Sequence, residues 1–348
     1  MRFSLFVHME RWNDEVPHQQ AWDDLVELTQ LAEEGGFSTV WIGEHHAMEF
    51  TASPSPFPQL AYLAAKTERI RLGAGTVIAP FWHPVRAAGE TALLDVISKG
   101  RAEIGVARGA YQFEFDRLAG GLSARDGGSY LRELVPAMVK LWEGDYAHDG
   151  EHWQFPTSTA VPNPVQQSGP PVWIAARDPN THDWAVEHGY NIMVTPLSKD
   201  DDEVVDLMNK VNTAVANHPE VEGRPEVMVL RHTIVHPADE PEGWRPGAEA
   251  INRYYRTFGA WASNKQTPER GFLEPLPEAD FADKPEYSPE ALHRSAIIGT
   301  PEEVTARVRS YEELGYTEFG FWIDNSMTHA EKRASLELFL REVVPNFQ

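Results

Sequence analysis

Three consecutive ionisable residues, Glu44, His45 and His46, follow closely on an apolar segment, Thr39–Ile42, that is typical of a buried strand. Imidazole titrates near pH 6.5, so a histidine at a strand end can move a proton at neutral pH. We expect His45 to be a general acid or base and Glu44 to orient its ring. Two other interpretations stay open, a structural histidine satisfied by the glutamate and a metal site. Neighbouring histidines on a strand point to opposite faces, which disfavours the metal site.

Arginines follow two further apolar segments. Arg108 comes directly after Ala102–Ala107, and Arg177 comes directly after Val172–Ala176. The next residues, Asp178–Thr181, begin a predicted helix whose free N–H groups and dipole favour an anion. An ion pair with one of the many acidic residues, or an ordinary helix cap, would explain these residues as well. Because two such loops would share one rim, we favour a phosphate or carboxylate site.

The segment Leu72–Val77 carries three small residues, Gly73, Ala74 and Gly75, where a buried strand normally has bulky ones. Small side chains leave room for a flat group against the backbone, although a simple bulge would explain them equally well. The segment lacks the third glycine and the following helix of a dinucleotide-binding GxGxxG motif. A dinucleotide-binding fold is therefore disfavoured.

These residues must be positioned by the alternation of short apolar segments and helical segments that is typical of βα units around a parallel sheet. Eight strands are predicted, at Phe3–Val7, Thr39–Ile42, Arg71–Val77, Ala102–Ala107, Val172–Ala176, Asn191–Val194, Val227–Val235 and Glu318–Ile323. In a (β/α)8 TIM barrel, the residues after the strands form the active-site rim. We therefore predict an α/β fold of this type, with a doubly wound open sheet as the alternative.

We expect residues 1–348 to form one barrel domain with insertions near 146–171 and 263–289. The first insertion alternates polar and aromatic residues, which suggests a small hairpin. The second is rich in proline and acidic residues, which suggests a surface loop that forms no core. After it, Thr300-Pro301-Glu302-Glu303 is a capping box, which predicts that a helix begins there.

The chain of 348 residues carries 30 Lys+Arg against 53 Asp+Glu, a net charge of −23 at pH 7. A charge of this sign repels nucleic acid and anionic membranes, so neither is expected as a partner. Cysteine is absent, which excludes disulfides, thiolate metal ligands and a thiol nucleophile. We expect a cytoplasmic protein, because the N-terminal sequence is too polar for a signal peptide and no long apolar stretch occurs.

Three blocks of the sequence resemble the bacterial luciferase-like flavin-dependent monooxygenases, and they look closest to the luciferase catalytic subunit. The blocks are GGFSTVWIGEHHAMEF (Gly35–Phe50), IRLGAGTVIAPFWHPVRAAGETALLDVISKGRAEIGVARG (Ile70–Gly109) and PPVWIAARDPNTHDWAVEHG (Pro170–Gly189). The resemblance implies a (β/α)8 barrel that binds reduced FMN, supplied by a separate NAD(P)H:flavin reductase. In that family, the flavin reacts with O2 to form a C4a-hydroperoxide, which then oxygenates a small organic substrate.

Carried over by position, Arg108 matches the family's FMN-phosphate arginine, and His45 matches its acid/base histidine. Ala74 and Gly75 match a small pair, often joined by a non-proline cis peptide, that lies against the isoalloxazine ring. The resemblance implies further cofactor contacts from Arg177, Asp178, Asn180, Thr181, Tyr111 and Glu114.

The chain also departs from luciferase. Ala107 stands where luciferase has a reactive cysteine, Arg177-Asp178 stands where it has Glu-Ser, and an active-site tryptophan near Thr195 is missing. Neither light emission nor a long-chain aldehyde is therefore implied, and we expect an aldehyde, a ketone or another electrophilic substrate. The 263–289 insertion coincides with the family's mobile lid. Family members commonly form homodimers through the helices after the second and third strands, which the apolar Phe57–Ala65 would suit.

Two other functions stay open at this point. A non-catalytic flavin-binding partner subunit would need no acid/base residue, so His45 disfavours it. A coenzyme F420-dependent oxidoreductase could use the same barrel.

Overall fold

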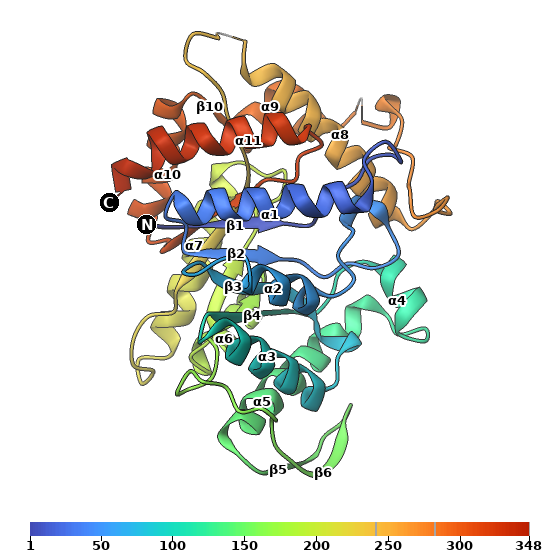
Figure 1. Cartoon of the computed structure of the whole chain (residues 1–348), viewed down its shortest axis with the longest axis vertical. Coiled ribbons are helices and arrows are strands. Elements are labelled where there is room, and N and C mark those ends of the chain that lie inside the picture. Colours follow the sequence, from blue (N-terminus) through green and yellow to red (C-terminus); the bar gives the residue numbers. More distant parts are fainter. Residues whose placement is uncertain (241, 282, 348) are drawn as a thin grey trace.

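The computed structural model describes residues 1–240, 242–281 and 283–347. Parallel strands close into a barrel surrounded by helices (Figure 1). In order around the barrel, the strands are β1 (Arg2–Val7), β2 (Thr39–Ile42), β3 (Arg71–Ile78), β4 (Ala102–Ala107), β7 (Val172–Ala175), β8 (Asn191–Val194), β9 (Val227–Val235) and β11 (Glu318–Trp322). Because β11 pairs with β1 and β8 pairs with β9, the sheet closes on itself. The predicted barrel is confirmed, every predicted strand end lies within one residue of the observed one, and the open sheet is wrong.

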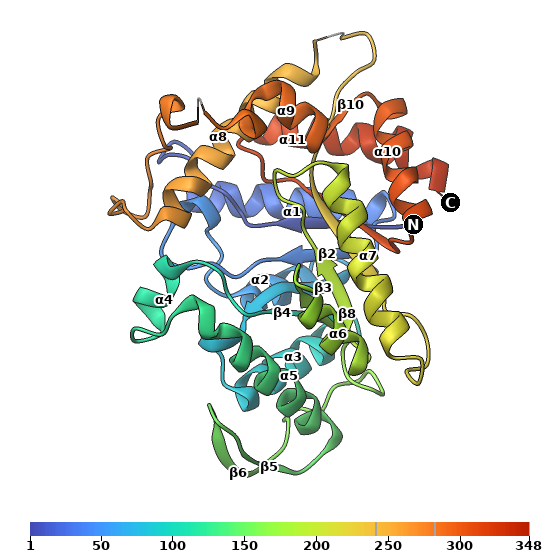
Figure 2. The same cartoon turned by 180° about the vertical axis from the view of Figure 1, so that it is seen from behind.

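Helices connect the strands and cover the outside of the barrel (Figures 1 and 2). Most are amphipathic, so one face packs on the sheet and the other meets water. The predicted capping box begins α10, with the Thr300 hydroxyl and the Glu303 carboxylate each accepting the other residue's backbone N–H. The helices are α1 (His18–Glu34), α2 (Pro56–Ala64), α3 (Pro84–Ser98), α4 (Gln112–Leu118), α5 (Gly127–Glu143), α6 (Pro179–Glu187), α7 (Asp201–Asn217), α8 (Trp244–Ser263), α9 (Pro289–Ser295), α10 (Pro301–Leu314) and α11 (His329–Leu338).

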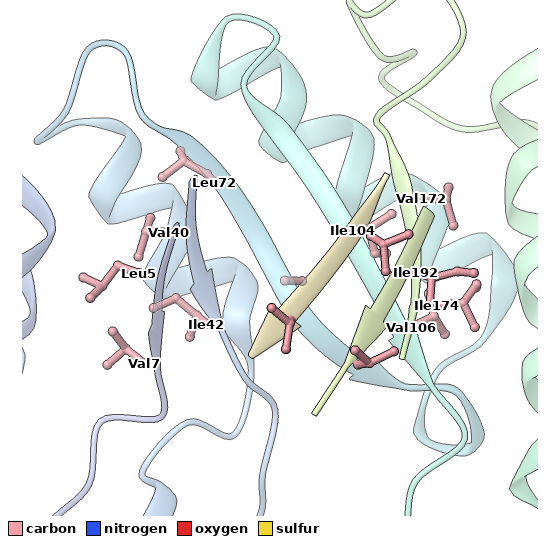
Figure 3. Close-up of a cluster of buried hydrophobic side chains, with 14 of the residues drawn as sticks. Leu5, Val7, Val40, Ile42, Leu72, Ile104, Val106, Val172, Ile174 and Ile192 are labelled. Atoms are coloured by element: carbon pink, nitrogen blue, oxygen red, sulfur yellow. The ribbon is translucent and has the colours of Figure 1, made fainter. Parts of the chain in front are cut away.

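On most of the strands, alternate residues face two different apolar clusters. Leu5 and Val7 of β1 pack with the surrounding helices, as do Val40 and Ile42 of β2 (Figure 3). Phe6, which lies between Leu5 and Val7, belongs to a second cluster inside the barrel. This alternation follows from the two-residue period of a strand, and it explains why the buried strands are apolar throughout.

Two tryptophans fill the inside of the barrel toward the amino ends of its strands. Trp41 and Trp173 pack edge to face at 5.6 Å, and their indole N–H groups bond Glu318 at 3.1 Å and Glu103 at 2.6 Å. Gly73 makes room for them, because a Cβ there would lie 2.1 Å from the Trp41 ring. The space for a ligand therefore lies at the carboxyl ends of the strands.

The first insertion contains the expected hairpin, in which β5 (Tyr146–Asp149) pairs antiparallel with β6 (Gln154–Ser158). It projects at the opposite end of the molecule from α8 (Figure 1). In the second insertion, short 3-10 turns form at Glu278–Phe281 and Pro285–Tyr287. Phe281 is 9% exposed and packs against Tyr287 at 4.9 Å, so the expectation that this segment forms no core is wrong for Phe281.

One strand was not predicted. The short β10 (Ile297–Gly299) pairs with the last residues of β9, outside the closed barrel.

None of the helices in the described ranges combines the length and the hydropathy needed to cross a bilayer.

A buried lysine joins the two strands that close the barrel. Lys332 of α11 binds Glu10, which follows β1, at 2.5 Å and Asp324, which follows β11, at 3.3 Å. Glu10 also accepts the backbone N–H of Ser326 at 2.8 Å, and Asp324 accepts that of His8 at 2.5 Å. Burial alone would lower the pKa of Lys332, but the two carboxylates outweigh it and raise this pKa. The charged lysine therefore holds the loops after β1 and β11 together.

Replacing Lys332 with Met should lower the free energy of unfolding by about 3–5 kcal/mol, because two buried carboxylates then lose their cation. Lys140→Met is the control, since Lys140 forms a solvent-exposed pair with Glu143 and its loss should change stability little. Urea unfolding of the two variants and the wild type measures the difference. A loss for Lys332→Met no larger than that for Lys140→Met would contradict the role given to this lysine.

Candidate functional site

A cavity of about 510 Å³ opens at the carboxyl ends of the barrel strands. This volume is in the range of small-molecule sites. The walls come from the strand ends and from the first turns of α5. Eight of the residues predicted from the sequence line the cavity, namely Glu44, His45, Gly75, Arg108, Tyr111, Arg177, Asp178 and Thr181.

His45 pairs with Glu114 of α4, not with Glu44. Its Nδ1 lies 3.3 Å from a Glu114 oxygen that also accepts the backbone N–H of His46 at 2.8 Å. Glu114 is fully buried, and its second oxygen has no hydrogen-bond partner among the described residues. A carboxylate at Nδ1 favours a proton there, which leaves Nε2 free to accept one. The predicted orienting role of Glu44 is therefore wrong, and Glu114, predicted as a cofactor contact, does not line the cavity but orients His45.

Glu44 instead ties the end of β2 to the end of β3. One of its oxygens lies 2.8 Å from Nε2 of His46. The other accepts the backbone N–H of Ile78 and the indole N–H of Trp82, both at 2.8 Å. Both oxygens of this carboxylate are hydrogen-bonded within the protein, so Glu44 has a structural role. The described side chains contain no group of three or more His, Cys, Asp or Glu that could hold a metal ion.

Three arginines lie on one side of the cavity. Arg177 pairs with Glu203 of α7 at 2.5 Å, so the ion-pair interpretation is correct for this residue. Arg108 makes one long hydrogen bond, at 3.4 Å, to the carbonyl of Ala124. Arg132 of α5, which sequence reasoning missed, also lines the cavity. Within the described part of the chain, no carboxylate lies within 4.0 Å of Arg108 or Arg132, so two guanidinium groups remain for an anion.

The loop after β7 contributes less to this anion site than the sequence suggested. The Asp178 carboxylate accepts the Thr181 N–H at 2.9 Å, which is an ordinary helix N-cap. Burial alone would raise the pKa of Asp178, but its hydrogen bonds to Thr181 lower it. Asn180 does not line the cavity, and its carbonyl oxygen lies 3.5 Å from Arg132. The plain helix cap, left open above, is therefore correct for Asp178.

The small residues of β3 form the bulge that the sequence allowed, and one of them lies at the cavity. The pairing with β4 is irregular between Ala74 and Val77, so the strand does contain a bulge. Gly75 lines the cavity, where a Cβ would lie only 3.0 Å from Trp41 and 3.3 Å from Phe6. Ala74 does not line the cavity but packs in the helix-facing cluster. The cis peptide bond joins Gly75 to Thr76, one residue later than the expected Ala74–Gly75 bond.

The wall opposite the arginines contains aromatic residues, of which His8 was missed by the sequence reasoning. His8 follows β1 and Trp322 ends β11, with ring centroids 5.6 Å apart, and the His45 ring lies 4.8 Å from His8. Behind Trp322, the ring of His232 stacks at 4.0 Å. A signal for His8 was present, because it directly follows a predicted strand, as Arg108 does.

Trp261 of α8 and Tyr111, which precedes α4, pack beside His45. Trp261 lies 3.8 Å from the Tyr111 ring and 4.8 Å from the His45 ring. Burial, followed by the charge of Glu114, raises the pKa of Tyr111, so this phenol is uncharged at neutral pH. These rings restrict the access of water to His45.

Comparison with protein families decides the classification. The family described as luciferase-like monooxygenase matches residues 1–318. The chain belongs to this family. The luciferase-like assignment agrees with the cavity, which combines a small-residue strand, two arginines without a carboxylate partner among the described residues and a carboxylate-paired histidine.

Individual proteins agree with the luciferase-like assignment. The oxygenase component of the flavin-dependent trigonelline monooxygenase of Acinetobacter baylyi is 50% identical over 347 residues, which cover 100% of this chain and 96% of that protein. Monooxygenase RslO1 from Streptomyces bottropensis has the same fold, with a TM-score of 0.84, 25% identity and 100% of both chains covered. The FMN complex of the oxygenating constituent of 3,6-diketocamphane monooxygenase from Pseudomonas putida has a TM-score of 0.75 at 18% identity, covering 99% of this chain and 98% of that one. The predicted activity class, a flavin-dependent monooxygenase, is confirmed.

Proposed function

We propose that this protein is an oxygenase component that uses reduced FMN and O2 to oxygenate trigonelline or a closely related N-methylpyridinium carboxylate. The observation that carries the proposal is the cavity itself, with two guanidinium groups free for an anion at one end and the His45–Glu114 pair beside it. The substrate class is supported by the 50% identity, over the whole chain, to the trigonelline monooxygenase component.

The FMN phosphate fits the end of the cavity that holds Arg108 and Arg132. A phosphate carries up to two negative charges, and planar guanidinium groups bind its oxygens in pairs. The N-terminus of α5 adds to this attraction, because Gly128 of its first turn lines the same cavity. Gly75 and Ala107 provide walls without bulk where the flat ring would lie. The net charge of −23 does not prevent anion binding, because the local charge at this end of the cavity is positive.

The residues around the proposed flavin site can transfer protons and exclude water. Reduced flavin, when bound, supplies two electrons to O2, so that one oxygen atom enters the substrate and the other leaves as water. His45 would move a proton at Nε2 while Glu114 holds the ring through Nδ1. Tyr111 and Trp261 would exclude bulk water from the reacting groups.

The chemistry of the substrate agrees with the expectation from the sequence. A pyridinium ring is electron-poor, so its carbon atoms are electrophilic centres of the kind expected above. The volume of about 510 Å³ would be shared between the flavin and such a small substrate.

The proposal also includes the partner protein, the oligomeric state and the cellular location. A separate flavin reductase would supply the reduced cofactor, as the description of the relative as an oxygenase component suggests. A homodimer would cover the exposed apolar side chains of the adjacent helices α2 and α3, including Tyr62 at 46% exposure and Leu93 at 47%. The proposal includes a cytoplasmic location, which the absence of cysteine allows.

Arg132→Met should weaken the binding of reduced FMN about tenfold to a hundredfold, because a charge-assisted hydrogen bond contributes about 1.5–3 kcal/mol. Anaerobic titration with reduced FMN measures the dissociation constant. Arg125→Met is the matched control, since Arg125 is exposed on a neighbouring turn and does not line the cavity. Equal affinities for the two variants would contradict the phosphate site, and binding of reduced F420 but not of reduced FMN would favour the deazaflavin alternative.

His45→Asn should lower kcat about a hundredfold or more and leave the affinity for reduced FMN unchanged, because asparagine can hydrogen-bond but cannot take up and release a proton as imidazole does. Steady-state oxygenation of trigonelline with a generic flavin reductase measures this effect. His188→Asn, at the exposed end of α6, is the control. Unchanged turnover in His45→Asn would assign the proton transfer to another group or favour the partner-subunit alternative.

A further inference from the structure

The wall of the cavity at the ends of β1 and β11 has no role in the flavin site described above. We propose that His8 and Trp322 on this wall select the substrate, with an N-methylpyridinium ring lying against the two aromatic rings and a polar substituent of that ring bonded by His8. This inference rests on the proposed function and deepens it, because it names the residues that distinguish a cationic ring from a neutral one.

The order of the strands places this wall across the cavity from the arginines. Around the closed barrel, β11 lies four strands from β4 in either direction, and β1 lies four strands from β7. Trp322 is therefore opposite Arg108, and His8 is opposite Arg177. A cofactor whose phosphate is held on the β4 and β7 side leaves the β1 and β11 side for a second ligand.

Polar atoms without partners concentrate at this wall. The ring of His8 forms no hydrogen bond with any described residue, and its Nδ1 is buried. The indole nitrogen of Trp322 is also buried and unpartnered, as are both ring nitrogens of His232 and the hydroxyl of Tyr255. Buried polar groups normally have partners, so such a group of exceptions marks a place where a ligand or ordered water completes the bonds. His8 and Trp322 are the members of this group that line the cavity.

The structure holds the His8 ring in one position. Its backbone N–H bonds Asp324 at 2.5 Å, and Asp324 in turn binds Lys332. Gly43 leaves the space that the ring occupies, because a Cβ there would lie 2.4 Å from the His8 ring. The His8 ring also packs edge to face with Phe6, with the ring centroids 4.8 Å apart. A ring fixed in this way is a preorganised contact for a ligand.

The charges at the wall favour a cation. Burial, followed by the nearby His45 and His232, lowers the pKa of His8 well below its ordinary value, and burial lowers the pKa of His232 to about 3. Both imidazoles are therefore uncharged at neutral pH. Among the described residues that line the cavity, no lysine or arginine lies on the β1, β2, β9 or β11 side. Behind the wall, the buried Arg231, whose charge also lowers the pKa of His232, lies 3.7 Å from the Asp201 carboxylate, and the Glu114 carboxylate lies behind His45. Aromatic rings whose neighbouring cation already has a carboxylate partner are a suitable surface for a pyridinium ion.

The test compares the binding of trigonelline and nicotinate, which share the ring and the carboxylate but differ in the N-methyl group and hence in the charge of the ring. Isothermal titration calorimetry with the full-length wild type should show at least tenfold tighter binding of trigonelline. His8→Phe keeps an aromatic ring at this position and removes its hydrogen bonds, so the affinity for trigonelline should fall about tenfold. Trp322→Phe keeps the packing and weakens the π-surface, so the preference for trigonelline over nicotinate should shrink severalfold.

Controls separate a specific effect from a loss of structure. His152→Phe, a histidine that stacks on Tyr130 away from the cavity, should leave both affinities unchanged. Both wall variants should retain the wild-type affinity for reduced FMN within about twofold, which shows that the barrel and the arginine side are intact. Wild-type binding of trigonelline by His8→Phe, or equal affinities of the wild type for the two ligands, would overturn the inference.

Failure of the proposed function would look different. In that case the wild type would bind trigonelline in the calorimeter but yield no oxygenated product with reduced FMN and O2. Retained oxygenation by the wild type, with His8→Phe unchanged in KM, would refute only the substrate wall.

Discussion

Lys332 lies between Glu10 and Asp324 at the place where β11 meets β1, and all three charged groups are buried. Buried charges are costly unless they are paired and hydrogen-bonded, and here both carboxylates also accept backbone N–H groups from the loops that they join. The barrel can therefore close with these two loops in one defined arrangement. One of those backbone donors is His8, so the same interaction that completes the barrel also positions the aromatic wall of the cavity.

The mouth of the barrel is divided by charge. Arg108 and Arg132 give the β4 and β7 side a positive potential within a strongly acidic protein. The opposite wall, at the ends of β1 and β11, presents the uncharged rings of Phe6, His8 and Trp322. His45 lies between the two sides, with its tautomer set by Glu114 from α4. An anionic cofactor and a cationic ring can thus occupy neighbouring parts of one cavity without competing for the same groups.

The strands were predictable from the sequence because both of their faces are buried, which leaves short, nearly continuous apolar segments between polar loops. The residues at their carboxyl ends were predictable for the same reason, and Arg108 and His45 were found in this way. The hydrogen-bond partners that these residues find in other parts of the fold were not predictable from the sequence. Glu44, the carboxylate next to His45 in the sequence, accepts a hydrogen bond from Trp82 instead. The carboxylate that pairs with His45, that of Glu114, is 69 residues away in the sequence.

Other features of the structure could not be predicted, because the sequence around them carries no pattern that indicates them. Arg132 lies inside a helix, where an arginine is normally a solvated surface residue, and only the packing of α5 against the strand ends brings it to the cavity. The strand β10 spans only three residues, too few for a periodic pattern. The family resemblance indicated the flavin chemistry, but it did not indicate the wall formed by His8 and Trp322.

The proposed reaction transfers an oxygen atom from O2 to an N-methylpyridinium carboxylate by means of reduced FMN. The most direct measurement mixes the protein, loaded anaerobically with chemically reduced FMN, with trigonelline and 18O2, and then determines the mass of the product. We expect one 18O atom in each product molecule and no product when reduced FMN is omitted. A product without 18O, or one formed equally well without flavin, would show that the protein does not catalyse this reaction.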